Sequence, residues 1–287
     1  MIIDCHCHLF YENNLESIKA LQNKFVNFEN YSFYKRMINE VMKINSISTE
    51  DIIEKTVYHA KKAGFDKIVL LPLSVNENKI VKEWSKRYPQ LFIPFYNPPE
   101  KSNYDQILTD VSTALEKDNY KGLKIMLPFR KKFLNDKSLF AAWEIAENKK
   151  VPVIFHTGYP PPGTKKFVLK YANPIYLEDV IESYPNLNII IAHMGFPFVN
   201  IALSLAVQCP NIYVDVSNLM YMQPNNLKNL LLQAKEMIGV NKIIFGSDAF
   251  CPEMLETTIQ YFHKIEFLTK TEIEKIIGLN AKKILKI

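Results

Sequence analysis

The histidines of this sequence are placed in a way that suggests a metal site. The chain has six histidines among 287 residues, and four of them lie at the ends of short apolar runs. These four are His6, His8, His156 and His193, and a later apolar run leads into Asp248. Imidazole and carboxylate groups together suit Zn²⁺, Mn²⁺, Fe²⁺ or Co²⁺. We therefore expect one divalent ion, with zinc as the first choice, and the expected ligands are His6, His8, His156 and Asp248.

The spacing of the first two histidines supports this expectation. His6 and His8 are two residues apart, and on a strand this spacing points both side chains to the same face. Two imidazoles side by side pack poorly unless something satisfies their nitrogens, and a divalent metal does so. By the same alternation, Cys5 and Cys7 should point away from the histidines, toward the surrounding helices, as buried core residues rather than ligands. Asp4 shares the parity of the histidines and is expected to be a supporting polar residue.

Elements that could bring these residues together recur along the whole chain. Apolar runs rich in Ile, Val, Leu and Phe alternate with longer amphipathic segments, and such nearly continuous runs are typical of strands buried on both faces. The eight predicted strands are 2–8, 67–73, 91–96, 122–127, 152–156, 187–193, 212–216 and 242–247. Eight β–α alternations predict an α/β fold, a (β/α)₈ TIM barrel in a single domain over residues 1–287. A doubly wound open sheet lacks support, because no glycine-rich loop follows the first strand.

One segment interrupts the alternation. Residues 10–48 are long for a loop between a strand and a helix, and they carry several aromatic residues. We interpret this segment as a helical insertion that forms a lid over the strand ends. An extra helix packed on the outside of the barrel is the alternative.

The carboxyl ends of barrel strands converge on one face, where active sites are built. Lys124 lies on the fourth predicted strand and is a candidate substrate contact; a carbamylated lysine that bridges two metals and a solvated lysine are the alternatives. Arg130 follows that strand, and Arg36 lies in the insertion, so either could bind a substrate carboxylate through paired hydrogen bonds. Tyr159 begins a proline-rich loop that is expected to shape the pocket. Asp215, at the end of the seventh strand, is left without a role.

Composition excludes several classes of protein. The net charge is +5, from 35 Lys and Arg against 30 Asp and Glu, and the basic runs are short, so we expect no nucleic-acid partner. No apolar run approaches the ~18 residues that a membrane span needs, and we see no signal peptide. The expected partner is a small-molecule substrate and the expected location is cytoplasmic, with a homodimer among the possible oligomeric states.

Five motifs, in order along the chain, resemble those of a known family. They lie at residues 3–8, 155–158, 191–195, 245–248 and 278–281. Together they resemble the amidohydrolase superfamily, and within it the amidohydrolase-2 branch, which also holds the aminocarboxymuconate-semialdehyde decarboxylase group. The resemblance implies a metal-dependent (β/α)₈ barrel in which His6, His8, His156 and Asp248 match the metal ligands. His193 matches a histidine that acts in acid–base catalysis. The sequence departs from many members at Met126, where they have a histidine.

The motifs and the resemblance together predict a metal-dependent hydrolase that acts on a small, carboxylate-bearing substrate. The metal would lower the pKa of a bound water toward ~7 and so activate it. His193 would stabilise charge or move a proton, and Asp248 would accept the proton of the water. A decarboxylase or a hydratase with the same site is the first alternative, and a non-catalytic metal-binding barrel is the second. The expected carboxylate rests on the cations Lys124, Arg130 and Arg36.

Overall fold

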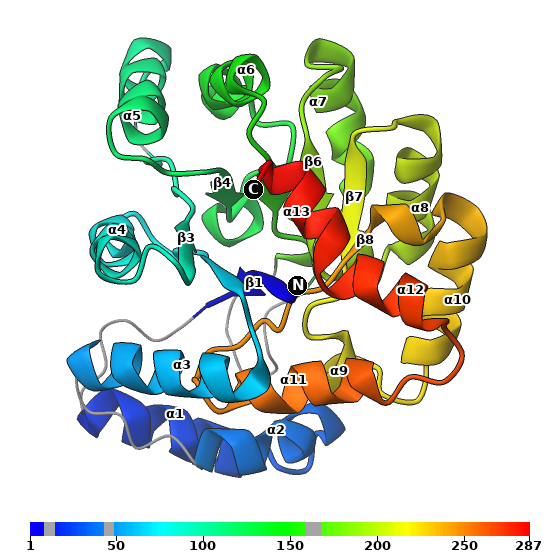
Figure 1. Ribbon diagram of the computed structural model, residues 1–287. Coiled ribbons are helices and arrows are strands. Elements are labelled where there is room, and N and C mark those ends of the chain that lie inside the picture. The colour runs from blue at the N-terminus through cyan, green and yellow to red at the C-terminus, as the bar shows by residue number, and fades with distance from the viewer. Residues whose placement is uncertain (9–14, 43–48, 101, 159–167) are drawn as a thin grey trace.

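Eight short parallel strands form the centre of the molecule in the computed structural model, which describes residues 1–8, 15–42, 49–100, 102–158 and 168–287 (Figure 1). The strands are β1 (Ile3–Cys7), β2 (Lys67–Leu70), β3 (Phe92–Pro94), β4 (Leu123–Ile125), β5 (Val153–Phe155), β6 (Ile189–Ile191), β7 (Ile212–Asp215) and β8 (Ile243–Ile244). β1 to β3 form one parallel ladder, and β4 to β8 form a second. Each strand lies inside its predicted range.

Backbone contacts join the two ladders into a closed ring. Tyr96 bridges to Leu123 between β3 and β4, and Cys7 bridges to Ala249 beyond the end of β8. The Cys5 amide also donates to the Phe245 carbonyl at 3.1 Å. The strands thus follow one another around a barrel in chain order. The predicted TIM barrel is confirmed.

Helices surround the strands as the alternation predicts (Figure 1). The outer helices are α3 (Thr49–Ala63), α4 (Glu77–Arg87), α5 (Tyr104–Glu116), α6 (Phe140–Lys149), α7 (Leu177–Ser183), α8 (Val199–Gln208), α10 (Leu227–Ile238) and α11 (Met254–His263). The chain ends in α12 (Lys270–Glu274), a π-helical turn (Lys275–Leu279) and α13 (Asn280–Leu285). Among the described residues, no helix combines the length and apolar character that crossing a bilayer requires.

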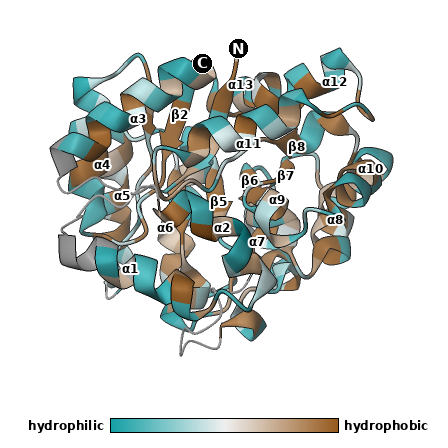
Figure 2. Cartoon of the chain, turned by 90° about the horizontal axis from the view of Figure 1, so that it is seen from below, coloured by the Kyte–Doolittle hydropathy of each residue, from teal (hydrophilic) through white to brown (hydrophobic). Residues whose placement is uncertain are grey.

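Two apolar clusters make up the core. The larger one lies between the strands and the outer helices, where residues such as Trp143 and Phe155 are fully buried. The smaller one joins residues from seven of the strands or their ends, such as Val69 and Ile154, to the last helix, α13. The helices are amphipathic, as this arrangement requires: apolar residues, brown in Figure 2, alternate along them with polar residues, shown in teal.

Cys5 belongs to the smaller cluster, which corrects the parity prediction. The pairing of β1 with β2 shifts register between Asp4 and Cys7, so the simple alternation of side chains breaks there. Cys5 therefore packs with inner residues such as Ile154, whereas Cys7 packs with the outer core. Both cysteines are buried and free, as expected of core residues.

The described part of the insertion forms two helices, α1 (Leu15–Asn27) and α2 (Ser32–Met42). They pack on each other, and α2 also contacts the short helix α9 (Leu219–Met222), which follows β7. The Arg36 guanidinium donates to the backbone carbonyls of Tyr221 and Met222, the latter at 3.1 Å. In Figure 2, α2 and α9 lie near the middle of the view, in front of the strands. Whether the insertion acts as a lid stays a prediction.

Candidate active site

His6 and His8 project from β1 and the residue after it, with their Nε2 atoms 3.0 Å apart. His6 Nδ1 lies 2.8 Å from a carboxylate oxygen of Asp215, and His8 Nδ1 lies 2.7 Å from the Leu71 carbonyl. A carboxylate and a carbonyl can only accept, so the proton of each neutral ring is on Nδ1. Each Nε2 therefore carries a lone pair, and the two lone pairs face a common point. This arrangement calls for a cation between them.

A glycine allows His6 to lie in this position. A Cβ atom added at Gly246 would lie 2.5 Å from the His6 Cβ, closer than real Cβ contacts allow. Gly246 lies two residues after the end of β8, so the close approach of this segment to β1 depends on the missing side chain.

Lys124 reaches the same point from β4, and the structure buries it completely. Its ammonium lies 3.0 Å from His6 Nε2, to which it donates. Burial lowers the pKa of Lys124 to about 8. Burial, followed by the charge of Lys124, also lowers the pKa of His6 and holds that of His8 well below its usual range. Both imidazoles are therefore neutral at neutral pH, which is the state that a metal ligand requires.

Asp248 completes a compact group of three ligand atoms. One of its carboxylate oxygens lies 3.6 Å from His6 Nε2 and 3.9 Å from His8 Nε2. The Asp248 amide donates to the His6 carbonyl at 2.7 Å, and its backbone has a φ of 54°, in the left-handed region. Such a conformation is costly outside glycine and recurs at functional sites. Ligand atoms of His6, His8 and Asp248 lie within 4.8 Å of one another, as a divalent ion requires.

His156, the fourth predicted ligand, lies beside this group. Its Nε2 is buried and has no hydrogen-bond partner among the described residues. Its ring centroid is 5.2 Å from that of His193 and 5.0 Å from that of Phe129. Burial, followed by the charge of His193, lowers the pKa of His156 well below its usual range. A buried nitrogen without a partner is costly, so this atom also fits a metal ligand, although it lies outside the compact group of three.

His193 lies at the end of β6 and is also held in a left-handed conformation, with a φ of 53°. Its backbone amide donates to Asp215 at 2.8 Å. Its Nδ1 lies 3.1 Å from the Ser217 carbonyl and 2.8 Å from the Ser217 hydroxyl. The carbonyl fixes the proton on Nδ1, which leaves the Nε2 lone pair for chemistry.

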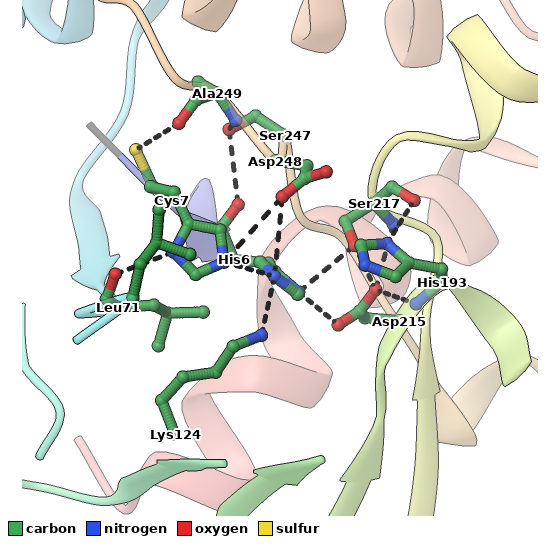
Figure 3. Close-up of polar contacts among 12 residues, drawn as sticks. His6, Cys7, Leu71, Lys124, His193, Asp215, Ser217, Ser247, Asp248 and Ala249 are labelled. Atoms are coloured by element: carbon green, nitrogen blue, oxygen red, sulfur yellow. Dashed lines mark hydrogen bonds and ion pairs between the residues drawn. The ribbon is translucent and has the colours of Figure 1, made fainter. Parts of the chain in front are cut away.

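Asp215 connects His6 to His193, and the sequence alone gave no role to this residue. Its carboxylate accepts from the ring of His6, the amide of His193, and the amide and hydroxyl of Ser217 (Figure 3). Burial alone would raise the pKa of Asp215, but its electrostatic interaction with His6 and these hydrogen bonds hold it well below its usual range. The sequence did carry a signal for this role. Asp215 lies at the end of a predicted buried strand, and the preceding predicted strand, its neighbour in the barrel, ends at His193.

The residues predicted to contact the substrate lie in different environments. Arg130 donates to the side chain of Asn97 and to the Pro98 carbonyl, and its Nε lies 3.3 Å from Glu100. Two of its three nitrogens, Nε and Nη2, are thus engaged by the chain, and Arg130 does not line the cavity described below. Arg36 is likewise bound to backbone carbonyls. Lys124 does reach the metal site, and Tyr159 lies outside the described residues.

A cavity of about 350 Å³ opens beside the ligands. Four residues of the site line this cavity, together with Gly158, Asn218 and Lys24. The rest of its wall is apolar. The polar or charged site residues are His8, His156, His193 and Asp248, and the largely apolar wall consists of Phe25, Phe33, Tyr34, Met37, Leu73, Met126, Phe129, Met222 and Phe250. Several of these come from α1 and α2, so the insertion forms part of the cavity wall.

Sequence comparison identifies a family. A family model described as amidohydrolase matches residues 3–287. A curated relative, protein fluG of Emericella nidulans, is 26% identical over 118 residues. The match covers 40% of this chain and 13% of fluG, so it concerns a small part of that protein.

Solved structures share the fold over almost the whole chain. A TIM-barrel protein of Bordetella bronchiseptica has a TM-score of 0.76 and 19% identity, covering 99% of this chain and 98% of its own. The 4-oxalomesaconate hydratase of Rhodopseudomonas palustris has a TM-score of 0.66 and 17% identity, covering 100% and 96%. A manganese-bound 5-carboxyvanillate decarboxylase of Novosphingobium aromaticivorans has a TM-score of 0.67 and 13% identity, covering 100% and 97%. At these identities the likeness establishes the fold alone.

Proposed function

The chain belongs to the amidohydrolase family, whose model matches residues 3–287, and we propose that it is a metal-dependent hydrolase of a small molecule. The observation that carries the proposal is the pair of unprotonated Nε2 atoms of His6 and His8, 3.0 Å apart beside Asp248. These groups fit a divalent cation, and His156 is the proposed fourth ligand. Zinc remains our first choice. When bound, such an ion supplies Lewis acidity toward a substrate carbonyl and toward water.

Hydrolysis needs a base for the attacking water and an acid for the leaving group, and the site has one residue for each. The Asp248 side chain is 17% exposed and lines the cavity, so it can accept a proton from water. His193 lines the same cavity with its Nε2 lone pair available, so it can take up a proton and pass it on. Groups in such roles typically contribute ~10²–10⁴-fold in rate. The presence of two separate proton-transfer groups favours a hydrolase over a reaction that needs only one such group.

A decarboxylase or hydratase is the second candidate. Its support is the wall of aromatic residues, such as Phe33, Phe129 and Phe250, together with the reactions named for two structures of the same fold. An apolar cavity disfavours a charged carboxylate more than a transition state in which that charge is dispersed.

Product analysis separates these candidates. The purified chain is stripped of metal with a chelator, reloaded with Zn²⁺ or Mn²⁺, and screened against lactones, amides and small carboxylic acids. Incorporation of ¹⁸O from labelled water into a cleaved product supports the hydrolase, whereas release of CO₂ supports the decarboxylase. A chain that binds no divalent ion under any loading condition overturns both. A chain that binds metal and turns over nothing favours the non-catalytic barrel.

A further inference from the structure

A lysine from the insertion lines the cavity, and the sequence analysis did not single it out. Lys24 lies in the last turn of α1, next to Phe25, and both residues form part of the cavity wall. The side chain is neither fully exposed nor fully buried. Burial lowers the pKa of Lys24, and no charged group of the described chain contributes to that shift. Lys24 lies on α1 of the insertion, whereas His6, His8 and Asp248 lie on or after barrel strands.

The other cations considered for substrate binding are engaged elsewhere. Arg36 is bound to the carbonyls of α9, and Arg130 is bound to residues that follow β3. Lys124 is fully buried against His6. Among the described residues of the cavity wall, Lys24 is the one lysine or arginine.

We propose that Lys24 determines specificity by binding an anionic group at the end of the substrate remote from the reacting carbon. The inference rests on the proposed function, because it takes the metal end of the cavity as the reacting end. The substrate class that follows is a small molecule with three parts. A carbonyl or carboxyl group meets the metal site, an apolar body contacts the aromatic wall, and a carboxylate or similar anion meets Lys24.

The surroundings of Lys24 explain why an anion would be preferred there. Phe25 and Phe33 line the cavity with it, and the Lys24 side chain is partly buried. A partly desolvated ammonium attracts an anion more strongly than one in bulk water. A neutral substrate would fill the apolar cavity but leave the ammonium without a compensating charge. Hydrogen bonds to charged groups correspond to a gain in affinity of roughly 10- to 100-fold.

Two hydroxamates test the proposal on the zinc-loaded chain of 287 residues. A hydroxamate group chelates divalent ions, so it fixes one end of the probe at the metal. 4-Carboxybenzohydroxamate presents an anion at the other end, and 4-methylbenzohydroxamate presents a neutral group of similar size. Calorimetry should give an affinity about 10- to 100-fold higher for the carboxylate probe.

Variants assign that preference to one side chain. Lys24→Met should reduce the ratio of the two affinities, carboxylate probe over methyl probe, to about one while leaving the affinity for the methyl probe unchanged. Lys24→Arg should retain most of this preference. Lys19→Met is the matched control, because Lys19 lies exposed on the same helix and should have no effect. Thermal melting checks that each variant folds.

The outcomes distinguish this proposal from the function on which it rests. If both probes bind equally, or if the preference survives in Lys24→Met, Lys24 does not determine specificity. If neither probe binds the metal-loaded chain, the metal-dependent function itself is wrong, and the proposal falls with it.

Discussion

Replacing Asp215 by Asn should weaken metal binding although Asp215 is not expected to touch the metal. One carboxylate oxygen accepts from His193 and Ser217, and the other accepts from His6 Nδ1 at 2.8 Å. In Asp215→Asn, the amide oxygen would keep the several donors of His193 and Ser217. The amide nitrogen would then face the His6 Nδ1 proton. Two donors cannot face each other at this distance. The remaining acceptor near His6 Nδ1 is the Ser217 hydroxyl oxygen at 3.1 Å, which also lies 2.8 Å from His193 Nδ1, so the tautomer with the His6 proton on Nε2 is favoured.

That tautomer removes the lone pair on which metal binding depends. The Nε2 proton could be donated to His8 Nε2 across 3.0 Å, but the Lys124 ammonium, 3.0 Å from the same atom, would lose its acceptor. Mutation of such an outer partner typically costs 10- to 100-fold in metal affinity, or about 1.4–2.8 kcal/mol. Since the change here removes a ligand atom of the group of three, we expect a loss near the upper end, about 100-fold.

Competition with a chromophoric chelator measures the affinity, and the ¹⁵N shifts of the His6 ring report its tautomer. Asp4→Asn is the matched control. Asp4 is also fully buried at this end of the barrel, and burial raises its pKa to about 7. It accepts from the amides of His6 and Ser247 and from the Ser247 hydroxyl, but from no ring nitrogen. A loss of less than about tenfold in Asp215→Asn, or an equal loss in Asp4→Asn, would refute the reasoning.

Three further predictions follow from the same geometry. His193→Ala should lower turnover by ~10²–10⁴-fold while elemental analysis finds the metal still bound, whereas His6→Ala should lose the metal; a metal-free His193→Ala protein would contradict the assigned role. Gly246→Ala should lower both the melting temperature and the metal affinity, because the new Cβ would collide with His6; unchanged values would mean that β8 can move away. Metal should be retained well below pH 6.5, because burial lowers the pKa of His8 and so keeps the ring neutral as the pH falls. Metal content measured after dialysis across this range checks it, and release that begins near pH 6.5 would be inconsistent with a buried site.

The barrel was predictable because its signal is repeated. Eight apolar runs separated by helical patterns specify one architecture, and the closure of the ring follows from their number. The meeting of His6, His8 and Asp248 was predictable for a related reason. Parallel strands deliver their carboxyl ends to one face whatever their separation in sequence, so each histidine at a strand end was already assigned to a common region.

The errors arose where a local irregularity or a side-chain choice decided the outcome. The register shift in β1 sent Cys5 inward, and nothing in the residue types of that strand announces a shift. Arg130 was expected at the substrate because it follows a strand end, but backbone and side-chain acceptors after β3 use its donors instead. Lys24 was missed because an amphipathic helix presents many lysines, and its tertiary packing selects the one that meets the cavity.

These differences divide the site into two parts with different origins. His6 and His193 lie at strand ends and are connected through Asp215 and Ser217, so a change to one of these residues should alter the others. Much of the apolar wall comes instead from α1 and α2, which line the opposite part of the same cavity through Phe25, Phe33, Tyr34 and Met37. Substrate preference can therefore change by substitution in the insertion without loss of the metal centre. Substitutions at Lys24 should accordingly alter which probe binds, whereas a substitution at Asp215 should weaken every probe that binds through the metal.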